Sequence, residues 1–231
     1  MLKPVRTIRL FPSFLEGIVV TYHQVLEAFK EGGLKGLLRP RFFRNRKATP
    51  VVMDLSSITI PTDVLRDSNC KFIELKLENL VEGNLFFKSF SRGVKASRNL
   101  KRGWRGFALI QGDLVVGDIW CVVPFEDGIP AAHPDLAMLG ITCGAKDAYA
   151  FDMYISPVHR GENLAAPFQR SLQAALKSEG WCKVYGYYWD DNLPALWMHR
   201  VLKFKELPKR QVSRFLFYQK ADTIIKASHL A

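Results

Sequence analysis

The spacing of apolar residues along the chain changes near Pro50. Before this point, apolar side chains recur at steps of three and four residues. This spacing predicts a helix over 15–29 that ends at Gly32, followed by a shorter element over 34–38. After Pro50, short apolar runs lie between turn residues and predict strands. These strands cover 51–55, 71–77, 104–110 and 114–123.

The middle of the chain carries weaker patterns. The two strands on either side of Gln111-Gly112-Asp113 are typical of a β-hairpin. The stretch 81–100 predicts a helix, although glycines interrupt its apolar repeat. Gly, Pro and Asp residues over 124–146 predict a long loop, which in a compact domain often covers a substrate site.

Strands and helices alternate in the C-terminal part. Alternating apolar residues predict a strand over 147–155, and apolar residues at every fourth position predict a helix over 163–179 that stops at Gly180. This order, after a meander of strands, favours an α/β (α+β) fold with helices on the faces of a sheet. The further elements are a strand over 183–189, a helix over 193–202 capped by Asn192 and a last strand over 212–219.

Length and composition change this picture little. A chain of 231 residues, 48% of them hydrophobic, can bury a full core, so we predict one domain over 51–231 and a helical, basic N-terminal extension over 1–50. We find no apolar run of about 18 residues and no signal-peptide cleavage pattern, so we expect a cytoplasmic protein. The cysteines are scattered without a C-x-x-C pair, so we expect neither a metal site nor a disulfide framework.

The formal charge of +11 indicates either an anionic partner or simply a soluble basic surface, because such an excess attracts phosphates, acidic lipids and nucleic acid but also keeps a protein in solution. A phosphate-rich cofactor would be such a partner. The segment 39–47, which mixes arginines with two phenylalanines, is a candidate contact for an anionic membrane, an acidic partner or nucleic acid. We favour a packed helix with a solvated basic end for this segment, and we do not expect nucleic acid as the main partner.

The junction between the strand ending at Ile155 and the helix starting near Asn163 carries the best candidate chemistry. Such a junction presents unpaired backbone N–H groups and the positive end of the helix dipole, which suit a pyrophosphate. The loop resembles that of the GNAT superfamily of acyl-CoA N-acyltransferases. The family motif is Arg or Gln, two residues, Gly, one residue, then Gly or Ala. Arg160 and Ala165 match it, and Asn163 replaces the glycine, as the next-best residue for a positive φ.

Two further segments carry the same resemblance, which covers about residues 71–220. The hairpin over 106–117 resembles the family's central hairpin. The stretch 192–204 looks like the family's Asn, Ala, Leu, Tyr, Gly, Phe signature. In this stretch Asn192, Ala195 and Phe204 fall in place, Met198 replaces the leucine, His199 the tyrosine and Lys203 the glycine.

The resemblance implies a mixed, mostly antiparallel central sheet and a direct reaction. An amine attacks the thioester of acetyl-CoA or another acyl-CoA, with no covalent enzyme intermediate. The family takes its oxyanion and pantetheine contacts from the strand backbone where neighbouring strands splay apart, and its pyrophosphate contacts from the loop. The cofactor-binding residues so implied are Met153, Tyr154, Ile155, Arg160, Gly161, Glu162, Asn163, Leu164, Ala165 and Asn192.

The general base stays open between two carboxylates. Asp152 shares a strand face with Tyr154, and relatives often place a carboxylate on this strand. Asp118 shares a face of the hairpin with Trp120. Either carboxylate is alternatively a solvated or salt-bridged group.

The general acid is equally open. Many relatives use the signature tyrosine to protonate the departing thiolate, but His199 stands at that position. An unperturbed histidine has a pKa of about 6.5 and can donate a proton near neutral pH. Tyr187 and Tyr188 on the neighbouring strand are alternatives, and a packed structural histidine is a further interpretation of His199.

The acceptor is not set by these patterns, since small amines, amino sugars, amino acids and protein amines all suit the fold. Two other functions stay open. One is a non-catalytic acyl-CoA-binding domain in which the departures at Asn163, His199 and Lys203 reflect lost catalysis. The other is a basic binder of membrane or nucleic acid that acts through the N-terminal segment.

Overall fold

The computed structural model describes Tyr22 and residues 43–59, 65, 69–124, 132–215 and 218–223. Apart from Tyr22, which is helical, the helix predicted over 15–29 and the element predicted over 34–38 lie outside the described residues. The chain divides into two compact units, each assembled from separate segments of the sequence. The first unit contains Met1–Arg39, Pro61–Cys121 and Phe151–Leu172, and the second contains Pro40–Ile60, Val122–Ala150 and Gln173–Ala231.

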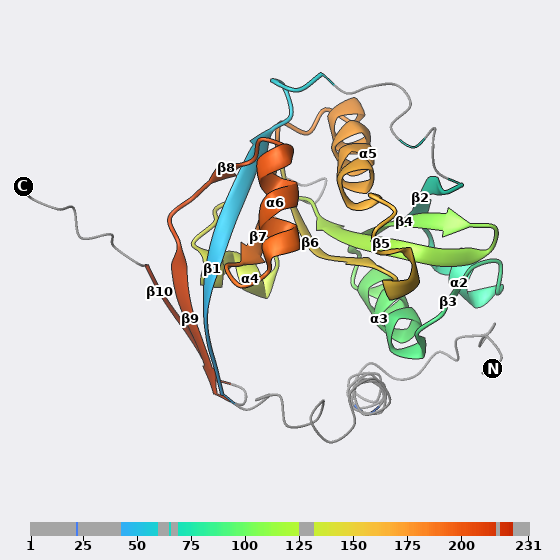
Figure 1. The fold of residues 1–231 in the computed structure, drawn as a ribbon, viewed down its shortest axis with the longest axis horizontal. Helices are drawn as coiled ribbons and strands as arrows, with labels where there is room; N and C mark the ends of the chain where they lie inside the picture. The colour runs from blue at the N-terminus through green and yellow to red at the C-terminus, as the bar shows by residue number, and fades with distance from the viewer. Residues whose placement is uncertain are drawn as a thin grey trace, which may run out of the picture. The chain divides into compact units, whose positions relative to one another are not determined.

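Antiparallel strands organise the first unit (Figure 1). Strands β4 (Arg105–Gln111) and β5 (Leu114–Val122) form the predicted hairpin, which turns at Gly112 with a φ of 63°. Strand β2 (Lys71–Leu75) pairs antiparallel with β4, and the short strand β3 (Phe86–Phe87) pairs parallel with β5. The hairpin prediction is confirmed.

Two helices, α2 (Leu77–Val81) and α3 (Phe90–Lys101), occupy the region in which the sequence predicts one helix over 81–100. Helix α3 begins only after Ser89, whose side chain accepts a hydrogen bond of 3.3 Å from the amide of Arg92. The residues before it form turns and β3. The predicted helix is therefore confirmed over 90–100 and wrong over 82–89, where turns and the pairing of β3 outweigh a weak apolar repeat.

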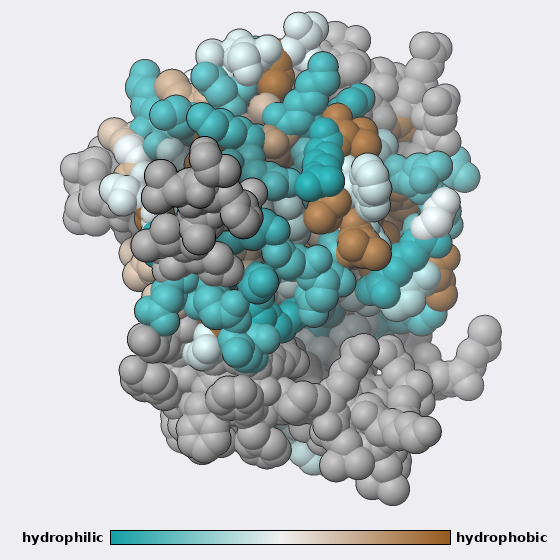
Figure 2. All heavy atoms as spheres, turned by 60° about the vertical axis from the view of Figure 1, so that its left-hand side comes forward, coloured by the Kyte–Doolittle hydropathy of each residue, from teal (hydrophilic) through white to brown (hydrophobic). Residues whose placement is uncertain are grey.

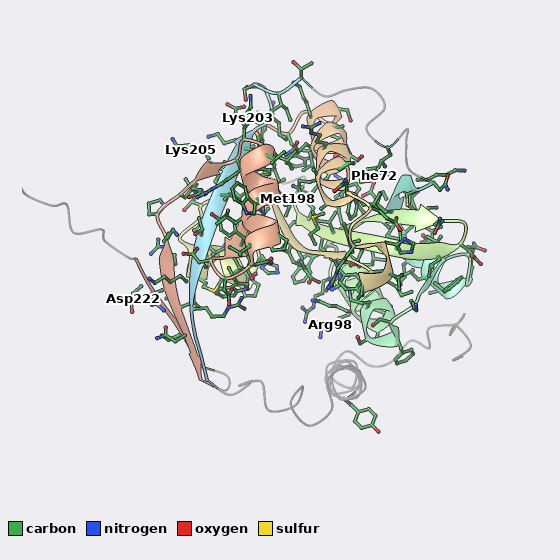
Figure 3. The ribbon with its side chains drawn as sticks, in the orientation of Figure 1. Phe72, Arg98, Met198, Lys203, Lys205 and Asp222 are labelled. Atoms are coloured by element: carbon green, nitrogen blue, oxygen red, sulfur yellow. The ribbon has the colours of Figure 1, made fainter. Side chains whose placement is uncertain are left out.

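Aromatic side chains build the core of the first unit. Phe72 of β2, labelled in Figure 3, stacks on Phe107 of β4 with ring centroids 5.5 Å apart. It also meets Phe168 edge-on at 6.0 Å. Phe168 belongs to α5 (Ala165–Ser178), and both it and Phe107 are buried. Each buried ring contributes roughly 1.5–3 kcal/mol, so these contacts fix α5 to the strands.

Antiparallel strands also organise the second unit. Strand β1 (Phe43–Asp54) pairs with β9 (Arg210–Phe215) through its first half and with β7 (Lys183–Trp189) through its second half. Strand β10 (Tyr218–Thr223) pairs with β9. The single strand predicted over 212–219 is therefore two antiparallel strands.

Strand β1 corrects the boundary predicted for the N-terminal extension. The sequence assigns 1–50 to a helical extension, but 43–50 lie in this strand. The cations suggested a solvated helix end, whereas pairing on both edges satisfies the backbone in an extended conformation. The guanidinium carbon of Arg46 lies 4.5 Å from the ring centroid of Trp189, and Arg46 also pairs with Asp191.

Helices α4 (Pro134–Leu139) and α6 (Leu193–Val201) belong to the second unit. Helix α4 lies inside the stretch predicted as a loop over 124–146. A proline in its first turn and Gly140, with a φ of 64°, set its two ends. Strand β6 (Asp147–Ile155) begins in this unit, where it runs parallel to β7, and its last five residues belong to the first unit.

The described strands are mainly antiparallel. The parallel pairs are β3 with β5 and β6 with β7, and β8 (Lys205–Glu206) adds a short antiparallel pair to β1. With its flanking helices, this arrangement confirms the mixed α/β class. None of the described helices is long and apolar enough to cross a membrane. On the face shown in Figure 2, hydrophilic residues cover most of the described surface.

Candidate active site

The end of β6 departs from regular strand geometry at Asp152. This residue has a φ of 52°, in the left-handed region that few non-glycine residues adopt. The residues 147–151 before it are all buried, whereas 152–155 are only partly buried. The alternation of buried and exposed residues predicted for this strand is therefore absent, and the backbone departs from extended geometry at the residue just before Met153–Ile155.

Strand β5 approaches the end of β6 closely. The amide of Ser156 donates a hydrogen bond of 2.8 Å to the carbonyl of Val116. A Cβ atom at Gly117 would lie only 3.1 Å from the carbonyl oxygen of Tyr154, which is tighter than ordinary packing. Glycine at this position therefore allows the backbone of β5 to lie against the backbone at Tyr154.

Arg160 lies in the loop that connects β6 to α5. Its Nε donates a hydrogen bond of 3.1 Å to the carbonyl of Ile155, and its guanidinium carbon lies 5.9 Å from the ring centroid of Tyr154. Gly161 and Asn163 both have positive φ values, 101° and 54°. Asn163 therefore adopts the left-handed conformation that asparagine tolerates better than most residues.

The same loop offers donors for an anion. In the described part of the chain, the amides of Gly161, Asn163 and Leu164 make no hydrogen bond to a backbone carbonyl. They precede the N-terminus of α5, whose dipole favours negative charge. The only carboxylate in the loop is that of Glu162, and both of its oxygens lie 3.2 Å from Nδ1 of His159. The residues present thus fit a pyrophosphate.

A group of charges lies beside the break in β6, with Asp118 buried and the other three side chains partly buried. We name it the Arg92 cluster: Arg92 and Lys95 from α3, Asp118 from β5 and Asp152 from β6. Arg92 donates from Nε to Asp118 at 3.3 Å, and its Nη2 pairs with the other oxygen of the same carboxylate. The indole N–H of Trp120 also donates to Asp118, at 2.9 Å. The face shared by Asp118 and Trp120 is therefore as predicted.

Arg92 binds Asp152 as well. Its Nη1 donates to the two carboxylate oxygens at 3.2 and 3.0 Å, and Nζ of Lys95 lies 2.6 Å from one of them. Nη2 also donates to the backbone carbonyl of Asp152, at 3.4 Å. The guanidinium carbon of Arg92 lies 4.6 Å from the ring centroid of Tyr154. Asp152 and Tyr154 thus meet the same arginine, as their shared strand face predicts.

The two carboxylates of the cluster differ in accessibility and in pKa. Burial raises the pKa of Asp118 above its usual value. Burial opposes the charge of Asp152 too, but Arg92 and Lys95 hold its pKa below the usual value. The side chain of Asp118 is 1% exposed and that of Asp152 is 28% exposed, so an amine can reach only Asp152.

The second unit holds a different group of candidates, which we name the Tyr188 cluster: Tyr188, His199, Phe204 and Glu206. The ring of His199 stacks on Tyr188 at 5.4 Å and meets Phe204 edge-on at 4.9 Å. Nδ1 of His199 lies 2.7 Å from the carbonyl of Ala195. Because a carbonyl only accepts, Nδ1 carries the proton, and burial lowers the pKa of this imidazole.

Tyr188 is bound at its hydroxyl. The phenol donates a hydrogen bond of 2.8 Å to Glu206, and burial together with this carboxylate raises the pKa of Tyr188 to about 12. Tyr187 packs edge-on against Trp189, with ring centroids 5.4 Å apart. Asn192 caps α6 by accepting a hydrogen bond of 3.3 Å from the amide of Ala195.

No protein-family model and no curated protein matches the sequence. Solved structures match its fold. The GCN5-related glucosamine N-acetyltransferase region of a fungal multi-domain GH3 β-N-acetylglucosaminidase gives a TM-score of 0.52 at 12% identity, over 80% of this chain and 23% of that chain. The chain has the GNAT fold. A Drosophila protein solved by structural genomics gives a TM-score of 0.50 at 8% identity, over 81% of this chain and 57% of that one. This chain thus spans only part of the length of either protein, and the likeness shows the fold alone.

Two departures from the GNAT sequence pattern keep a backbone that glycine favours. Asn163 and Lys203 stand where the resemblance to GNAT motifs expects glycines, and both have left-handed φ values, 54° and 60°. Lys203, labelled in Figure 3, follows the last turn of α6, a position where a left-handed residue commonly ends a helix. The residue types at these two positions differ from glycine, but the left-handed backbone conformation that glycine adopts readily is present.

His199, at the position of the GNAT tyrosine, is a poor acid in this structure. Its one proton at neutral pH is bound to a carbonyl of its own helix, and its lowered pKa disfavours a second proton. Among the described residues, no group of three or more His, Cys, Asp or Glu side chains is arranged to hold a metal ion.

Sequence reasoning missed Arg92 and Lys95. A signal was present, because α3 carries cations three residues apart and no acidic residue in its first turn. Charges with no partner on their own helix need partners elsewhere when they are buried. That rule would have linked Arg92 to the two carboxylates of the strands, which were already candidates.

Proposed function

We propose that the protein transfers an acyl group from acetyl-CoA or another acyl-CoA to an amine. The loop after β6 carries this proposal, because it combines two left-handed residues, Arg160 and three amides that make no backbone hydrogen bond within the described residues. Such a loop suits the pyrophosphate of coenzyme A. The GNAT fold agrees with it, although fold does not determine reaction.

In this proposal the loop from Arg160 to Ala165 holds the pyrophosphate, while the backbone of Met153–Ile155 aligns the pantetheine arm and the thioester. Asn192 keeps its amide nitrogen for the same arm, since its side-chain oxygen caps α6. Acyl-CoA supplies the activated carbonyl. The strand supplies fixed backbone donors, which stabilise an oxyanion at no reorganisation cost.

The reaction forms one bond and breaks one. The amine nitrogen bonds to the thioester carbon, the carbon–sulfur bond breaks, the amine loses a proton and the thiolate gains one. Of the two candidate proton donors, Tyr188 is protonated at neutral pH, with a pKa of about 12, and it donates this proton to Glu206. Asp118 is too buried to serve as the base, and the lowered pKa of Asp152 weakens it in that role.

The acceptor we propose is a small amine or an amino sugar. The fungal region of similar fold is named a glucosamine N-acetyltransferase, and this supports the class of acceptor. Protein amines are the alternative acceptor. Contact with an anionic membrane through 39–47 stays a prediction, since 39–42 lie outside the described residues.

A non-catalytic acyl-CoA-binding domain is the second candidate. The candidate acid and base residues are already bound to other groups of the protein, and this favours the second candidate. The carboxylates of Asp118 and Asp152 are ion-paired, and His199 is neutral and packed. Binding of acyl-CoA without release of free thiol across a panel of amines and amino sugars would support this second candidate over the first.

Calorimetric titration with acetyl-CoA and longer acyl-CoAs tests the cofactor site. We expect wild type to bind and Arg160→Glu to bind at least about tenfold more weakly, because the change removes a cation and adds an anion beside the pyrophosphate. Arg170→Glu is the matched control, since Arg170 is an exposed arginine on α5 outside the loop. Wild type that binds no acyl-CoA would refute the proposal.

A further inference from the structure

The left-handed conformation of Asp152 needs an explanation, because it lies inside a strand. A non-glycine residue with a φ of 52° is disfavoured relative to extended backbone. Asn163 has nearly the same φ, but it lies in a loop. Surrounding contacts must therefore hold Asp152 in this conformation.

Arg92 supplies those contacts. Its guanidinium binds both the carboxylate and the backbone carbonyl of Asp152, and it does so while it is fixed by Asp118. One planar group thus joins the side chain and main chain of the residue that carries the break. Lys95 adds a second cation to the same carboxylate, at 2.6 Å.

The contacts extend from Asp152 to the loop. The ring of Tyr154 lies within cation–π distance of two guanidinium groups, with Arg92 at 4.6 Å and Arg160 at 5.9 Å from its centroid. Arg160 in turn donates to the carbonyl of Ile155. The charges that hold the break are thereby connected to the residues that the proposed function assigns to the thioester and the pyrophosphate.

We propose that Arg92 and Asp152 are positioning residues that hold β6 in its left-handed break and thereby align the backbone of Met153–Ile155 with the pantetheine arm. This inference rests on the proposed function. It gives Asp152 a role different from that of a general base: the carboxylate is an anchor for Arg92, and the conformation at residue 152 is what the cofactor site requires.

Three substitutions at one position separate conformation from charge. Asp152→Asn, Asp152→Gly and Asp152→Ala all remove the carboxylate, while Arg92 keeps Asp118 as a partner, so no buried charge is left alone. Glycine and asparagine adopt a left-handed φ readily, but alanine does not. Only the alanine variant should therefore relax to a regular strand.

The probes are acetyl-CoA, which reaches along the strand, and ADP, which carries the pyrophosphate without a pantetheine arm. By calorimetry, we expect Asp152→Ala to bind acetyl-CoA about five- to tenfold more weakly than wild type. The asparagine and glycine variants should stay within about twofold of wild type. ADP should bind all four proteins alike.

Other outcomes overturn the inference. Equal weakening of acetyl-CoA binding in all three variants would show that the charge itself is needed. Unchanged binding in all three would show that residue 152 does not position the strand. Parallel loss of ADP and acetyl-CoA in the alanine variant would indicate general disruption. Wild type that binds neither probe would instead refute the proposed function, and with it the inference.

Arg92→Lys gives an independent check. It keeps the charge beside Asp118 but loses the fork that spans both carboxylates. We expect acetyl-CoA binding to weaken as in Asp152→Ala, and the added change Asp152→Gly to restore most of it. A double variant that binds as weakly as Arg92→Lys alone would contradict the positioning role.

Discussion

The Arg92 cluster and the Tyr188 cluster hold their candidate residues by different physical means. In the first, one guanidinium binds two carboxylates and a backbone carbonyl from two strands. In the second, the ring of His199 packs against two aromatic rings and keeps one hydrogen bond to its own helix. The phenol of Tyr188 donates a hydrogen bond to Glu206. Charge holds the first group and ring packing holds the second.

This difference sets how each group tolerates change. Asp118 is buried, with 1% of its side chain exposed, and Arg92 is only 14% exposed, so the loss of one leaves the other unpaired in a medium that solvates it poorly. In the Tyr188 cluster, the side chain of Glu206 is 35% exposed, so water can replace a partner that it loses. The first group should be sensitive to single substitutions, and the second should accommodate them.

Arg92→Ala should show the largest effect. It leaves Asp118 buried without its cation, and we expect the free energy of unfolding to fall by about 3–5 kcal/mol, measured by urea denaturation. The matched change in the other cluster, Tyr188→Phe, removes one partly solvated hydrogen bond and should cost about 1 kcal/mol.

A second variant sharpens this test. Arg92→Met combined with Asp118→Asn removes the buried charges together and should recover much of the stability lost in Arg92→Ala. A loss in Arg92→Ala no greater than that in Tyr188→Phe would show that the two clusters do not differ in the way proposed.

Gly106→Ala should have an intermediate effect. A Cβ atom at this position would lie 2.7 Å from the ring of Trp120, which is fully buried and donates to Asp118. We expect a loss of about 1–3 kcal/mol from overpacking, again by urea denaturation. Gly103→Ala is the control, because its φ is 76° but no atom lies within 4 Å, so only backbone strain of about 1 kcal/mol applies. Equal losses of unfolding free energy in Gly106→Ala and Gly103→Ala would show that the contact with Trp120 is not what destabilises the first variant.

The smallest effect concerns pH and His199. Burial lowers its folded pKa below the unfolded value of about 6.5, so protons bind the unfolded state more readily. The stability that neutral His199 contributes is present above pH 6.5 and is lost as pH falls through the folded pKa. The slope cannot exceed about 1.4 kcal/mol per pH unit for one proton.

His199→Phe should remove this slope. We expect unfolding free energies measured between pH 8 and pH 5 to fall less steeply in the variant than in wild type. Asp152 should respond in a separate window, because its pKa is lowered and its contribution to stability is lost only below about pH 3.9. Parallel curves for wild type and His199→Phe would show that the imidazole does not titrate with unfolding.

Strong local patterns predicted the fold well. The hairpin of β4 and β5, the helix α5, the strand β7 and the helix α6 follow from alternation, four-residue repeats and the cap at Asn192. The first half of strand β1 was not predicted, because its cations suggested a solvated helix end. Its pairing with strands distant in the sequence cannot be read from the local pattern.

The candidate site was predicted in parts. Asp118 and Asp152 were chosen for their strand faces, but the arginine that joins them lies 26 and 60 residues away. The stacking of His199 on Tyr188 depends on tertiary packing that no spacing rule encodes. Residue types and faces were readable from the sequence, whereas their ion pairs and protonation were not.

The left-handed conformations of Asn163 and Lys203 bear on how protein families are recognised. A glycine in a sequence motif often reflects a need for a positive φ, and another residue can take its place while the backbone keeps that angle. Each such exchange removes one letter from the pattern and leaves the shape intact.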